Sequence, residues 1–156
     1  MVECLIGLAI SAMLMTALAV AFNASIINFR ENETVFASIN NARQALNRMT
    51  SQLRTADGVQ FTAPANQCVF LSSASELLTY EYRNASHSTD PNTLVLIKSG
   101  TAYTLCDNVT AASFTKTQAD GDPNDSKSVL ISLTVQTGDV QRSLSAAAVV
   151  RRALVM

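Results

Sequence analysis

The amino-acid sequence predicts an α+β fold in which the second half of a long N-terminal α-helix packs on an antiparallel β-sheet. Three observations carry this prediction. The chain opens with an uncharged apolar run, continues with an apolar stripe at helical spacing, and then changes to short segments in which apolar and polar residues alternate. A helix with one apolar face and a sheet with one apolar face bury these surfaces against each other.

The apolar run is long enough to cross a membrane. From Cys4 to Phe22 there is no charged residue, and only Ser11 and Thr16 are polar. As a helix this run spans about 28 Å, close to the hydrocarbon thickness of a bilayer. It fits a cleaved secretory signal, a membrane anchor, or a helix that is held first in a membrane and later in a protein assembly. A signal peptide has a basic segment before its apolar run, whereas the only early charge here is Glu3, which favours a retained helix.

The helix is expected to continue well beyond the apolar run. Neither Pro nor Gly occurs between Phe22 and Gly58, and apolar residues recur there at alternating spacings of four and three residues: Val35, Ile39, Ala42, Leu46, Met49 and Leu53. This pattern forms one apolar stripe on a helix. We expect residues 1–29 to form an apolar membrane or assembly helix. Residues 30–156 are expected to form the head, from an amphipathic helix over 30–57 and a sheet over 58–156. A coiled coil or a membrane-tethered stalk is the alternative for the helix.

The remaining chain is predicted to form β-strands. In the segment 128–136, apolar residues at every second position place one face of a strand in a core. Gly138-Asp139 is typical of a hairpin turn, which favours a strand over 140–154. The expected strands cover residues 58–62, 68–72, 77–83, 93–98, 102–106, 112–116, 128–136 and 140–154.

Composition disfavours several functions. The formal net charge is −1, so the chain lacks the cationic field that holds nucleic acids. One His and three Cys are few for a zinc site or for a nucleophile activated by His. We therefore expect a protein that is not an enzyme and that carries no cofactor.

Cys68 and Cys106 each lie in a strand-like segment. In an exported head they are expected to form a disulfide that closes a long loop, whereas in a reducing compartment they would be buried thiols. The loop around Asp120, Asp122 and Asn124 partly matches a calcium-binding loop. However, Asp125 stands where that pattern has Gly, and its final Glu is missing, so a solvated acidic turn is favoured over a metal site.

The acidic residue at the head of an uncharged helix, in the sequence Val2-Glu3-Cys4-Leu5-Ile6, resembles the type IV pilin and pseudopilin superfamily. The segment RQALNRMTSQLRTADGVQF is similar to PilW-type minor pilins and J-type pseudopilins. In the superfamily a Glu occupies the fifth mature position. Glu3 takes this position if two residues precede Met1, and otherwise lies two positions early.

The resemblance implies a structural subunit of an extracellular filament, stored in the inner membrane and polymerised through its N-terminal helix. Its implied partners are membrane lipid before assembly, the inner-membrane assembly machinery, and identical or homologous subunits. The implied assembly residues are Glu3 and Met1, whose amine would meet the carboxylate of Glu3 in a neighbouring subunit. The filament-core side chains are expected to be Leu5, Ile6, Leu8, Ile10, Leu14, Leu18 and Phe22, and the helix–sheet contacts Val35, Ile39, Leu46, Met49 and Leu53.

Two alternatives to a pilus subunit stay open. One is a membrane-tethered binding module that remains monomeric, in which Glu3 has no special role. The other is a pseudopilin of a type II secretion or competence system. Adhesion, motility, DNA uptake and secretion all use this architecture, so the sequence selects neither one of these roles nor a major or minor subunit.

Overall fold

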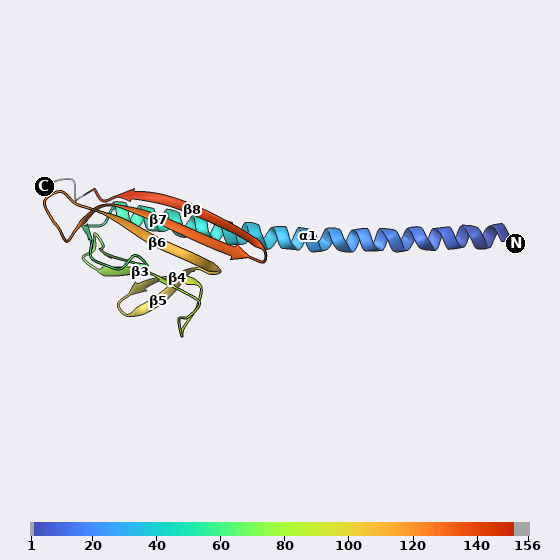
Figure 1. Cartoon of the computed structure of the whole chain (residues 1–156), viewed down its shortest axis with the longest axis horizontal. Helices are drawn as coiled ribbons and strands as arrows, with labels where there is room; N and C mark the ends of the chain where they lie inside the picture. The colour runs from blue at the N-terminus through green and yellow to red at the C-terminus, as the bar shows by residue number, and fades with distance from the viewer. Residues whose placement is uncertain (1, 152–156) are drawn as a thin grey trace. The chain divides into compact units, whose positions relative to one another are not determined.

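A computed structural model describes residues 2–151 (Figure 1). One helix, α1 (Val2–Arg54), precedes all the strands, and the chain divides into two compact units, Met1–Phe36 and Ala37–Met156. The sequence-based division lies somewhat earlier, at 29/30, because it marks where charged residues return rather than where the compact head begins. The predicted α+β class is confirmed: one long apolar helix is followed by antiparallel strands.

The first sheet of the second unit has five antiparallel strands in the order β1-β2-β3-β4-β5. Each strand therefore lies beside its neighbours in sequence, as in a β-meander. The observed β3 and β4 coincide with two of the predicted segments. The strands are β1 (Gly58–Val59), β2 (Gln67–Leu71), β3 (Leu77–Arg83), β4 (Thr93–Lys98) and β5 (Thr101–Cys106).

A second sheet contains β6 (Val109–Gln118), β7 (Ser126–Thr137) and β8 (Val140–Val149), in that order. The sequence predicted a single sheet, whereas the structure has two, with Asn108 at a left-handed φ of 58° just before β6. Here β6 pairs with β7 instead of β5. The predicted hairpin at Gly138-Asp139 is present, with Thr137 opposite Val140. The last predicted strand ends at Val149, and its residues 152–154 lie outside the described part.

The core of the second unit joins the C-terminal part of α1 to both sheets. Figure 1 shows β6, β7 and β8 running along this part of the helix. Met49 and Leu53 are fully buried, together with Ile131 from β7. The rings of Phe70 and Tyr80 stack with their centroids 5.2 Å apart. Burial of each such side chain stabilises the fold by roughly 1.5–3 kcal/mol, so the amphipathic half of α1 is an integral part of the head.

Candidate functional site

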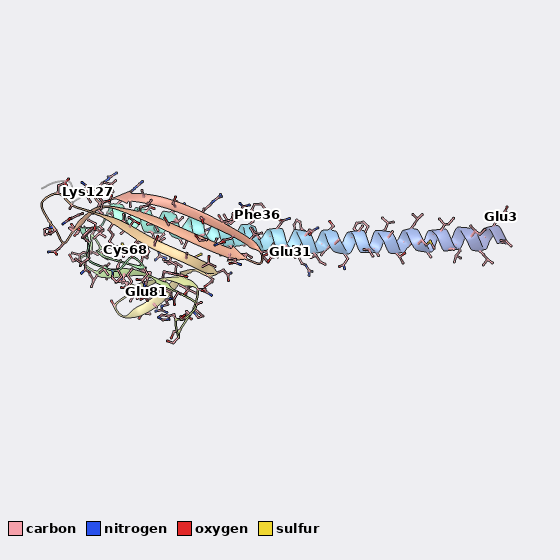
Figure 2. The ribbon with its side chains drawn as sticks, in the orientation of Figure 1. Glu3, Glu31, Phe36, Cys68, Glu81 and Lys127 are labelled. Carbon is pink, nitrogen blue, oxygen red and sulfur yellow. The ribbon has the colours of Figure 1, made fainter. Side chains whose placement is uncertain are left out.

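The first unit presents apolar side chains to its surroundings on every side of the helix. Figure 2 shows these side chains standing away from the ribbon all along it. The large apolar residues from Val2 to Phe36 that the helix exposes range from 49% exposed at Ile27 to 73% at Met13. By length and composition, α1 is able to cross a membrane. In water this surface would be unstable, so it requires lipid or protein around it.

All the predicted filament-core side chains belong to this exposed surface. Each is more than half exposed: Leu5, Ile6, Leu8, Ile10, Leu14, Leu18 and Phe22. The predicted set ends at Phe22, and Ile26, Ile27, Phe29 and Phe36 beyond it are exposed as well. The uncharged stretch up to Arg30 was the available signal for the first three. Phe22, Phe29 and Phe36 recur at every seventh position, so they share one face of the helix.

Glu3 is the single charged residue between Val2 and Phe29. It lies in the first turn of α1, where the helix dipole favours a carboxylate, and it is exposed. None of the ion pairs within residues 2–151 includes it. Met1, the other predicted assembly residue, lies outside the described residues. Among the described residues, Glu3 is thus an anion without an ion-pair partner at one end of an apolar surface. In a membrane such a carboxylate stays at the polar interface or pairs with a cation.

The predicted helix–sheet residues differ in burial. Leu46, Met49 and Leu53 are buried in the core of the second unit. Ile39 is half-buried near the start of that unit, and Val35 is half-buried within the first unit. The spacing of the apolar residues did not predict one polar contact of this helix. The hydroxyl of Tyr80 donates a hydrogen bond to the side chain of Gln52.

The predicted disulfide between Cys68 and Cys106 is wrong for this fold, since both thiols are free. Cys68 lies on β2 and Cys106 on β5, with β3 and β4 between them. Three strand spacings separate the residues by about 14 Å, whereas bridged Cα atoms lie within about 7 Å. Burial raises the pKa of Cys68 to about 12, opposed by Lys116, and burial together with Asp107 raises the pKa of Cys106 to about 11. Both are therefore protonated, unreactive thiols at neutral pH.

The acidic loop uses its oxygens to hold the protein together. Asp120 pairs with Lys127 at 3.1 Å, and Asp122 accepts a hydrogen bond from the backbone N–H of Asn124 at 2.8 Å. Asp125 accepts from the backbone N–H of Val59 at 2.6 Å, which ties β1 to the start of β7. Within the described ranges, no group of three or more His, Cys, Asp or Glu side chains is placed to hold a metal ion. The predicted calcium candidates therefore act as turn and ion-pair residues.

Among known proteins, no family model, no curated protein and no solved structure matches the chain. The chain's own residues are therefore the guide to function: an apolar helix exposed on all sides, Glu3 in its first turn, and a folded α+β unit that follows in the sequence.

Proposed function

We propose that this chain is a structural subunit of a type IV pilus-like extracellular filament. The subunit is stored in the inner membrane and polymerised through its N-terminal helix. The observation that carries the proposal is the first unit itself, which exposes apolar side chains on every face and leads with one carboxylate. Such a surface suits lipid before assembly and a bundle of like helices after it. The residues around Glu3 resemble type IV pilins, which supports the same assignment.

Transfer from lipid to a helix bundle gains little hydrophobic energy, because both surroundings are apolar. Association must therefore come from close packing and from the rare polar groups. Gly7, with open space around its Cα, and Ser11, whose hydroxyl bonds back to the Gly7 carbonyl at 2.8 Å, allow close approach of a neighbouring helix. We expect an energy-driven membrane machine to extract the subunit, since the hydrophobic gain alone does not drive the step.

Glu3 gives this proposal a specific requirement. A carboxylate buried in an apolar bundle is costly unless a cation pairs with it, and the proposed cation is the N-terminal amine of a neighbouring subunit. Replacing Glu3 removes this pair without touching the core of the second unit. The Glu3→Ala chain is thus expected to fold its head normally and to reach the membrane, but to enter filaments at least tenfold less.

The test is intact-mass spectrometry of filaments sheared from cells that express the wild-type, Glu3→Ala or Glu31→Ala chain. Glu31 is the matched control, because it is an exposed carboxylate on the same helix beyond the apolar run. Wild type and Glu31→Ala should appear in filaments, and Glu3→Ala should remain in the membrane fraction. A wild-type chain found only in the membrane would instead establish a tethered monomeric module. Equal filament yields from all three chains would show that assembly does not require Glu3.

A further inference from the structure

The outer edge of β8 has no hydrogen-bond partner among residues 2–151. In the β7–β8 ladder, Thr137 and Val140 close the hairpin, and the N–H of Val150 donates to Lys127 at 3.0 Å. Because hydrogen-bonded and non-hydrogen-bonded pairs alternate, the even-numbered residues of β8 bond to β7. The odd-numbered residues point their N–H and C=O groups away from the sheet. These residues are Gln141, Ser143, Ser145, Ala147 and Val149.

The other strand edges of the second unit are short, irregular or partly covered, whereas no described residue covers the β8 edge. At one sheet edge β1 has only two residues, and at the other the pairing of β5 with β4 is irregular at Leu94/Val95. The β6 edge is partly covered, since the N–H of Phe114 donates to Ala65 at 2.7 Å. In contrast, β8 is ten residues long, contains no Pro and pairs in unbroken register. An unprotected edge of this length is a template for another strand.

The edge also has a side wall, which makes it a groove. Residues of α1 at helical spacing face the C-terminal half of β8 across a hollow of about 490 Å³. From the helix come Asn47, Thr50, Ser51, Arg54 and Thr55, and from the β8 side Ala146, Ala147 and Arg151. The small side chains of Ala146 and Ala147 leave room for a strand. The polar residues of the helix offer hydrogen bonds to it.

Charge indicates what kind of strand this groove accepts. Arg54 and Arg151 line the groove, and none of the described residues that line it carries a carboxylate. Neither arginine takes part in an ion pair within the described residues. A second copy of β8 is disfavoured as the occupant, because it carries no carboxylate and would bring its own Arg142 towards these cations. An acidic strand satisfies both the cations and the free backbone groups.

We propose that the β8 edge binds an extended acidic segment of another polypeptide, which adds to the three-stranded sheet as a fourth strand. The segment pairs with the outward N–H and C=O groups from Ser143 to Val149. Its carboxylates meet Arg54 and Arg151. This binding surface goes beyond the filament role, and a tethered module would carry it equally.

The test uses the full-length chain in detergent micelles and two fluorescein-labelled peptides with six residues of alternating Val and Glu or Val and Lys. The Val-Glu peptide is expected to bind at least tenfold more tightly in a fluorescence anisotropy titration. Amide hydrogen exchange measured by NMR should slow at Ser143, Ser145, Ala147 and Val149 when this peptide is added, while the even-numbered amides, already bonded to β7, should change little. Equal binding of both peptides, or unchanged exchange at these four amides, would overturn the proposal.

Variants separate strand addition from charge attraction alone. Ala147→Pro removes one outward N–H without removing a bond to β7, so binding should fall at least fivefold, whereas the matched Ala147→Ser should bind like wild type. Arg151→Glu should weaken binding about tenfold. Arg48→Glu makes the same charge change on an exposed residue that does not line the groove, and should have little effect. If Ala147→Pro binds like Ala147→Ser, or Arg48→Glu weakens binding as much as Arg151→Glu, no strand is added at this edge.

Discussion

The two halves of α1 place the same residue types in opposite environments. Leu14 in the first unit is 60% exposed, and Leu46 in the second is 5% exposed. Both lie in regular helix, so secondary structure does not distinguish them. The second unit therefore carries its own hydrophobic core. The apolar side chains of the first unit are buried only when lipid or other chains surround them. Stability and assembly are therefore expected to respond to different residues.

The largest effect should come from truncating the buried leucine. Leu46→Ala leaves a cavity in the core of the second unit and should lower its free energy of unfolding by about 2–5 kcal/mol. Leu14→Ala should change this free energy by less than about 0.5 kcal/mol. Denaturant unfolding of the detergent-solubilised chain, followed by tyrosine fluorescence, reports on the second unit alone, because the chain has no Trp and all three Tyr lie beyond residue 36. Equal losses from the two variants would refute the separation of stability from assembly.

The cysteines extend the comparison to pH. The pKa of buried Cys68 is raised from 9.0 to about 12, so above pH 9 the unfolded chain loses a proton that the folded chain keeps. Stability from this group is present below pH 9 and falls as the pH rises towards 12, by up to about 1.4 kcal/mol per pH unit. Cys68→Ala should flatten the decline between pH 9 and 11, and Cys4→Ala, at an exposed site in the first unit, should not. Part of the decline in unfolding free energy with pH should remain in Cys68→Ala, because burial raises the pKa of Tyr80 as well.

The same residues show what sequence reasoning reaches and where it ends. Runs of β-forming residues between turn residues located β3 and β4, and the four-and-three spacing located the buried stripe with Leu46 and Met49. These patterns report which way a side chain faces but not which strand lies next to it. For that reason the second sheet, in which β6 pairs with β7, was not predicted. The predicted disulfide was wrong for the same reason. The strand order, which these patterns do not report, places β3 and β4 between Cys68 and Cys106.

The candidate sites divide in the same way. The exposed apolar helix and Glu3 could be predicted, because composition alone identifies a membrane-length segment and its lone charge. The free edge of β8 could not, since it depends on β8 being the last strand of a sheet and on which of its amides point outward. The groove is also invisible in sequence. Its two sides come from residues 47–55 and 146–151, which are far apart in the sequence.

A smaller effect sharpens the comparison inside the second unit, where polar atoms must be paired as they are buried. Tyr80→Phe removes the hydroxyl that bonds to Gln52 and leaves the amide oxygen of Gln52 without that donor. The expected loss is about 1–2 kcal/mol of unfolding free energy. Tyr82→Phe is the matched control, because its hydroxyl donates to the Thr110 carbonyl at 2.7 Å at an exposed position, where water replaces it. Unfolding curves that lose more stability from Tyr82→Phe than from Tyr80→Phe would show that burial does not set the cost of a lost hydrogen bond in this head.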